Sequence, residues 1–201
     1  MREVVILGAA RTIGGRFGGS FRDVAAPELG AAVVREAVVR SGITPETIDQ
    51  TIFGNAWQAG VGPNAARLCS VMGGIPEDVP GVSVNVRCGS SLQALIFGTQ
   101  AIKAGDAETV LVGGTENTSL IPYGLPRARW GYRMGDGTIV DLMHRDGFHC
   151  LLGGGLMGEI TQWLATERGI SREEQDSFAA ESHNKAEAAV KAGKFLAEIV
   201  P

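Results

Sequence analysis

The chain has few cysteines and no long hydrophobic run. Its three cysteines, at positions 69, 88 and 150, are an odd number in 201 residues. This favours a reducing compartment over a disulfide framework, and we expect a cytoplasmic protein. No stretch provides the 18 or more apolar residues that a membrane span needs, so no membrane association is expected. The N-terminus, "MREVVILGAARTIGG", has only a short apolar run, which predicts a first strand and not a signal peptide.

The chain also lacks an excess of positive charge. Eighteen Lys and Arg against 22 Asp and Glu give a formal net charge of −4, and the basic residues are scattered along the sequence. Nucleic-acid binders usually carry a basic patch, so nucleic acid is not an expected partner. Glycine, in contrast, is abundant at 29 residues. This abundance indicates many tight turns and places where a ligand can approach the backbone closely.

Strand-like and helix-like stretches alternate over the first 118 residues. Apolar runs predict strands at 3–9, within 44–56, at 81–86 and at 108–115, and helices are predicted between them at 27–42, 62–74 and 90–105. This alternation is typical of a parallel sheet with right-handed crossovers. The sequence therefore predicts an α/β fold, with a mostly parallel sheet and helices on both faces.

The alternation stops at about residue 119. Residues 120–155 carry Pro, Gly, Arg and aromatic residues without a clear period, which indicates a loop-rich excursion. Two helices are predicted after it, at 156–169 and 171–193, the second with a capping box of Ser171 and Glu174. We divide the chain into an α/β core, 1–118, and a loop-domain excursion, 119–201. Because no strand follows the last helix, we expect the excursion to be incomplete.

Cys88 lies between a predicted strand and a predicted helix, in "SVNVRCGSSLQAL" at 83–95. The free amides and the dipole of a helix N-terminus favour an anion, so we expect an available thiolate there. Gly89 permits a sharp turn, and the same amides could hold the oxyanion of an acyl intermediate. The alternative is that Cys88 is a small buried hydrophobic residue, as most free cysteines are.

The motif around Cys88 resembles the thiolase family, which makes or cleaves 3-ketoacyl-coenzyme A (CoA) through an acylated cysteine. Further matching segments run along the chain: "ILGAARTIGGRFGGSF", "GPNAARLCSVMGGIP", "GGTENTS", "RWGYRMGDGTIVD" and "GISREEQDSFAAESHNKAEAAVKAGKF". The resemblance implies a thiolase-like layered fold and an acyltransferase in which Cys88 accepts the acyl group. It implies no permanently bound cofactor, because the CoA thioester is the substrate.

The resemblance also implies binding residues and partners. Phe148, Leu156 and Met157 match apolar loop positions that contact the pantetheine and acyl parts of the thioester. Leu156 stands where some members have histidine, which leaves the acyl-chain preference open. The alternative is that these three residues only pack the excursion. Because thiolases associate through this half, a homodimer or tetramer is expected.

Two catalytic motifs of the family do not occur in residues 1–201. Its base is a histidine in a Gly-His-Pro motif, and its second cysteine lies in a Cys-x-Gly-Gly-Gly motif, both in the C-terminal half. We therefore expect little or no turnover without a C-terminal half, either continuous with this chain or supplied as a separate chain. A related 3-ketoacyl or hydroxymethylglutaryl synthase and a non-catalytic or regulatory subunit remain as alternatives.

Other residues near these motifs receive weaker predictions. Arg87 departs from the valine-type residue usual before the cysteine, and strand alternation predicts that it points away from the sulfur. His183 lies in a polar helical stretch and is expected to be solvated. His144 and His149 flank the "RDGF" turn and are not expected to be catalytic. The pair His149–Cys150 lacks a second ligand pair at metal spacing, so no metal site is expected.

Overall fold

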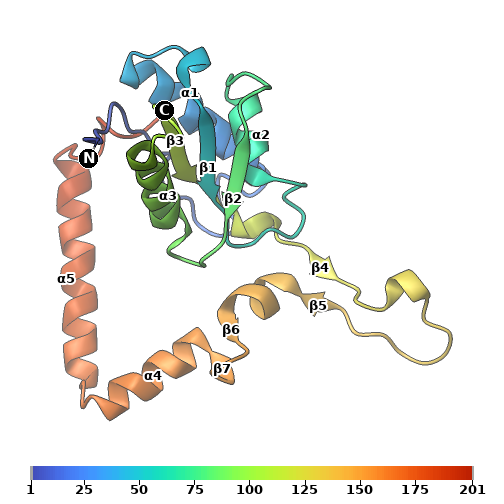
Figure 1. The fold of residues 1–201 in the computed structure, drawn as a ribbon. Coiled ribbons are helices and arrows are strands. Elements are labelled where there is room, and N and C mark those ends of the chain that lie inside the picture. The colour runs from blue at the N-terminus through green and yellow to red at the C-terminus, as the bar shows by residue number, and fades with distance from the viewer. Residues whose placement is uncertain (1, 201) are drawn as a thin grey trace.

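The core of the molecule is a three-stranded parallel sheet in the order β2–β1–β3 (Figure 1). A computed structural model describes residues 2–200. The strands are β1, Gln50–Gly54; β2, Gly81–Val84; and β3, Val110–Gly114. In the register, Ile52 of the central strand lies opposite Val82 on one side and Val112 on the other. The predicted α/β fold with a parallel sheet is confirmed.

Helices cover both faces of this sheet. They are α1, Ala26–Ser41; α2, Ala65–Met72; and α3, Ser90–Ala104, with a short 3₁₀ turn, η1, at Pro45–Thr47. Side chains alternate along a strand. Phe53 therefore packs against Val34 of α1 and Ala66 of α2, whereas its neighbour Ile52 packs with Ala94 of α3 on the opposite face. The predicted placement of helices on both faces is confirmed.

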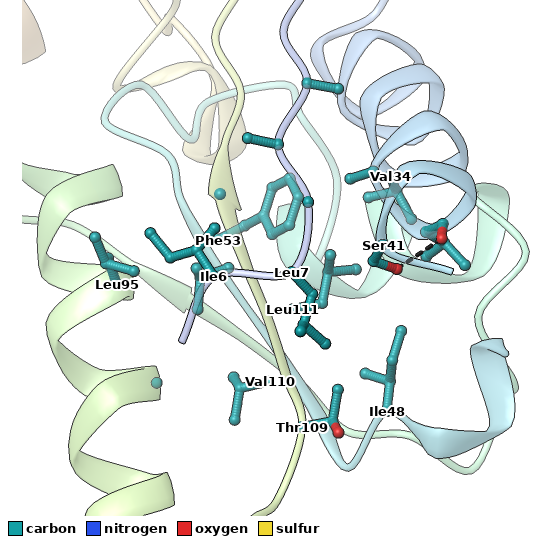
Figure 2. A pocket seen from close by; sticks show the side chains of 18 of the residues that line it. Ile6, Leu7, Val34, Ser41, Ile48, Phe53, Leu95, Thr109, Val110 and Leu111 are labelled. Atoms are coloured by element: carbon teal, nitrogen blue, oxygen red, sulfur yellow. Dashed lines mark hydrogen bonds between the residues drawn. The ribbon is translucent and has the colours of Figure 1, made fainter. Parts of the chain in front are cut away.

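The predicted strand at residues 3–9 is wrong, because the segment forms no β-ladder. It lines a groove of about 1010 Å³ whose other walls include β3, α1 and α3, as Figure 2 shows for Ile6 and Leu7 beside Leu111 and Leu95. Ile6 is 75% exposed. An apolar run becomes a strand only when a neighbouring backbone pairs with it, and the groove separates this run from β3.

Residues 9–11 instead contact the C-terminal tail. The Arg11 amide donates to the Glu198 carbonyl at 2.9 Å, and the Val200 amide donates back to the Arg11 carbonyl at 2.9 Å. Arg40 of α1 fixes both segments, because its guanidinium donates to the carbonyls of Ala9 and Ala197. The two ends of the described chain are thus held together beside α1.

The excursion extends away from the sheet and returns through a long helix (Figure 1). Its short elements are η2, Thr118–Leu120; β4, Tyr123–Gly124; η3, Ala128–Trp130; β5, Val140–Asp141; a π-helical turn, η4, His144–Phe148; β6, His149–Cys150; and β7, Gly155–Leu156. β4 pairs with β5 and β6 with β7, both antiparallel.

Two longer helices complete the excursion, α4, Met157–Glu167, and α5, Arg172–Lys191. Both were predicted, and the capping box is confirmed: Ser171 Oγ accepts from the Glu174 amide at 3.1 Å, and Glu174 Oε2 accepts from the Ser171 amide at 2.8 Å. No residue of α5 is buried. Across residues 2–200, no helix combines the length and the apolarity that crossing a membrane requires.

Candidate active site

The candidate site forms where the three parallel strands end. Residues 55–57 follow β1, residues 85–88 follow β2, and residues 115–117 follow β3. The first two segments are bonded together, since Asn85 Nδ2 and Arg87 Nη1 each donate to the Ala56 carbonyl at 3.1 Å. Ligand sites of open α/β sheets commonly form outside the carboxyl ends of the strands, so this edge is the candidate location of a functional site.

Cys88 lies at this edge and is exposed. Gly89 is the N-cap of α3, and the helix begins at Ser90. The elbow between strand and helix is therefore confirmed, and the alternative of a buried hydrophobic cysteine is wrong.

The hydroxyl of Ser90, which is 4% exposed, fixes the elbow from inside. It donates to the Arg87 carbonyl at 2.5 Å and accepts from the Val86 amide at 3.0 Å. The role of Ser90 was not predicted from the sequence, although a serine at a helix start is a common hydrogen-bond partner for the backbone of a turn.

The amides of Gly89, the N-cap, and of Ser90 are hydrogen-bonded within the elbow, whereas the next two amides of α3 are not. The Gly89 amide donates to the Val86 carbonyl at 3.3 Å and the Ser90 amide to the Arg87 carbonyl at 3.0 Å. The amides of Ser91 and Leu92 meet no acceptor within residues 2–200. A helix start leaves such donors for an anion. These two amides are therefore available to an acceptor at the start of α3.

Glu116 connects the ends of β1 and β3, a role that was not predicted from the sequence. Its Oε1 accepts from Asn55 Nδ2 at 2.9 Å and from the Trp57 amide at 3.1 Å, and its Oε2 accepts from the Ala56 amide at 2.8 Å. Burial raises the pKa of the Glu116 carboxyl, and the two amide donors, the Arg87 charge and Asn55 oppose that rise. The carboxylate thus organises the loop on which Arg87 and Asn85 rest.

The structure brings together the three predicted binding residues of the excursion. Phe148, Leu156 and Met157 line a pocket of about 500 Å³, and His144, Gly158 and Glu159 complete its walls. Glu159 Oε2 is engaged at the start of α4, where it accepts from the Leu156 amide at 2.7 Å. The exposed imidazole of His144 is therefore the remaining polar side chain of a largely apolar lining.

Trp57 connects this pocket to the nucleophile elbow. Its ring meets the Phe148 ring edge to face, with centroids 5.3 Å apart. Its Nε1 donates to the Met143 carbonyl at 3.1 Å, and the Arg87 guanidinium lies over the ring. Neither the groove beside β3 nor this pocket is lined by Cys88. The pocket, however, contains all three residues that the resemblance predicts to contact the substrate, so it is the better candidate for a substrate site.

The remaining histidines form no metal site. The rings of His144 and His149 are 5.9 Å apart, and His183 is exposed on α5. Among residues 2–200, no three His, Cys, Asp or Glu side chains gather where they could hold a metal ion.

Thiol labelling near neutral pH should distinguish the cysteines. Burial raises the pKa of the Cys69 thiol to about 12, and this side chain is 0% exposed. We expect a thiol reagent to modify exposed Cys88 in the native protein and Cys69 only after unfolding, because the thiolate is the reactive form. Peptide mapping by mass spectrometry measures this order. Labelling of Cys69 before Cys88 would contradict the site geometry.

An exposed cysteine at the turn from a strand to a helix, in an α/β fold, is an arrangement in which a thiol can serve as a nucleophile. The family model described as "Thiolase, N-terminal domain" matches residues 4–201. The chain belongs to the thiolase family. It is 49% identical over 201 residues to an acetyl-CoA acetyltransferase of Cupriavidus necator and 46% identical over 201 residues to one of Pseudomonas aeruginosa.

These alignments cover 100% of this chain but 51% of each relative. A relative from Syntrophomonas wolfei, also called acetyl-CoA acetyltransferase, is 46% identical over 202 residues with the same coverage. The chain therefore spans about half the length of the curated relatives that it matches.

Proposed function

We propose that the chain carries the nucleophile of a thiolase-type acyltransferase acting on CoA thioesters. The observation that supports this most directly is the exposed Cys88 at the start of α3. Within residues 2–200 the Ser91 and Leu92 amides of α3 have no acceptor, and Trp57 packs against Phe148, which lines the pocket together with Leu156 and Met157. The relatives named acetyl-CoA acetyltransferase point to the same chemistry.

The proposed reaction has two steps. In the first, the Cys88 thiolate attacks the thioester carbonyl, the acyl–sulfur bond to CoA breaks, and CoA leaves as a thiolate that takes up a proton. In the second, the thiol of CoA or the α-carbon of acetyl-CoA gives up a proton to a base of the C-terminal half and attacks the acyl carbonyl. The acyl–sulfur bond to Cys88 then breaks, and Cys88 leaves as a thiolate. The Ser91 and Leu92 amides would stabilise the negative oxygen of the tetrahedral intermediates, because donors fixed in advance are effective at such a position.

Full turnover is proposed to require residues outside this chain. A cysteine nucleophile is usually activated by a nearby base, and the resemblance assigns that base to a C-terminal half. That half would be continuous with this chain or a separate partner. With it, residues 1–118 would act as the core and 119–201 as the loop domain of a cytoplasmic homodimer or tetramer working in fatty acid metabolism.

The test is acetylation of the isolated chain. Incubation with acetyl-CoA should add the mass of one acetyl group, located at Cys88 by peptide mapping and removable by hydroxylamine. The amount should rise slowly to one group per chain, since the first step needs only the elbow and the pocket. A chain that remains unmodified while iodoacetamide labels Cys88 readily would refute the proposed function and favour a non-catalytic subunit.

A further inference from the structure

The residue before the nucleophile has an unusual backbone. Arg87 has φ 57°, and among residues 2–200 it is the one non-glycine residue with positive φ. A long side chain in this left-handed region is uncommon, and its surroundings must hold it there. Three bonds do so: the Arg87 amide donates to Asn85 Oδ1 at 3.1 Å, and the Arg87 carbonyl accepts from the amide and the hydroxyl of Ser90.

The Arg87 side chain lies against the loop after β1. Nη1 donates to the Ala56 carbonyl at 3.1 Å, and Cζ lies 5.2 Å from the centre of the Trp57 ring, within the range of a cation–π interaction. Within residues 2–200, no carboxylate oxygen comes within 4.0 Å of this guanidinium. The ring and the carbonyl are therefore the direct contacts of this cation, while the carboxylates of Glu116 and Asp146 attract it from a greater distance.

The Trp57 ring is in turn fixed to the excursion. Besides the edge-to-face contact with Phe148, its indole nitrogen is bonded to the Met143 carbonyl. Gly147 lies so close that a Cβ atom there would overlap the ring. Trp57 thus contacts both Arg87 of the elbow and the 143–148 turn of the excursion.

We propose that Arg87 is a positioning residue that fixes the Cys88 elbow relative to the Phe148 wall of the substrate pocket, with Trp57 as the link. This inference rests on the proposed function. Lysine cannot reproduce the contact, because it lacks the planar guanidinium that stacks on a ring while donating sideways. Loss of the link displaces the sulfur from a thioester bound in the pocket but leaves the sulfur itself accessible.

The test compares two reactions of Cys88 in the 201-residue chain. Acetylation by acetyl-CoA needs the Cys88 sulfur to be correctly positioned relative to the pocket. Alkylation by iodoacetamide needs only an accessible sulfur. We expect Arg87→Gln to slow acetylation about tenfold, since small misplacements of reacting groups are costly, and to change alkylation by less than about twofold. The acetylation rate of Arg87→Lys should lie between those of the wild type and Arg87→Gln. Arg172→Gln, on exposed α5, should match the wild type in both reactions.

A second readout does not depend on acyl transfer. The Trp57 indole N–H signal, assigned with Trp57→Phe, should shift when Cys88 is alkylated in the wild type, and this response should be lost in Arg87→Gln.

Equal losses of acetylation and alkylation in Arg87→Gln would overturn the inference, as would unchanged acetylation. If the wild type accepts no acetyl group, the proposed function fails, and the indole response alone decides. A response absent from the wild type, or equal in both proteins, would then overturn the role of Arg87.

Discussion

Replacing Cys88 with serine should abolish transfer of the acetyl group from acetyl-CoA to the chain. A serine hydroxyl is almost entirely protonated near neutral pH and is a weak nucleophile without a base, whereas a cysteine is already partly ionised. Loss of a nucleophile typically lowers the rate by a factor of about a thousand or more. Intact-mass measurement over a time course with acetyl-CoA would follow the loss.

Cys150→Ser is the matched control for this change. Cys150 is half-buried in β6, away from the elbow, and its sulfur accepts from the Gly153 amide at 3.1 Å. It should retain the wild-type rate of acetylation. If Cys88→Ser still accepted an acetyl group at the wild-type rate while Cys150→Ser did not, the nucleophile would be assigned to the wrong cysteine.

Much of the α/β core could be predicted because local and tertiary preferences agree there. Helix α1 begins with Pro27 in its first turn and ends at Gly42, whose φ of 71° suits glycine. The elbow was visible for the same reason: a short apolar strand, a glycine and a helix-forming run follow one another around Cys88. Such features are encoded within a few residues and need no knowledge of distant partners.

Features that depend on distant partners could not be predicted. The run at 3–9 has the composition of a buried strand, but strand formation needs pairing with a neighbouring backbone, and the run does not pair with the open outer edge of β3. Arg87 and Trp57 are 30 positions apart, and Trp57 and Phe148 are farther apart still. No local pattern indicates that these side chains meet. Phe148, Leu156 and Met157, which the resemblance predicts to bind substrate, do line one pocket, and their role in binding stays a prediction.

Gly54→Ala should displace the start of α3, next to Cys88, and lower the stability of the protein. Gly54 ends β1 directly beneath the start of α3, and a Cβ atom at this position would lie 2.6 Å from both Ser90 C and Ser91 N. Backbone atoms cannot move aside as a flexible side chain can, so the helix start must shift away from the sheet. Overpacking of this kind costs about 1–3 kcal/mol in the free energy of unfolding, which urea denaturation would measure.

The same substitution should also slow acetylation of Cys88, because the helix start that shifts carries the Ser91 and Leu92 amides. Gly14→Ala is the control, since no heavy atom lies within 4 Å of the added Cβ, and it should change neither quantity. Rates are compared well below the urea transition, so that unfolded protein does not contribute to the difference. If Gly54→Ala lowered stability but left acetylation at the wild-type rate, the contact between β1 and α3 would support the fold without positioning the nucleophile.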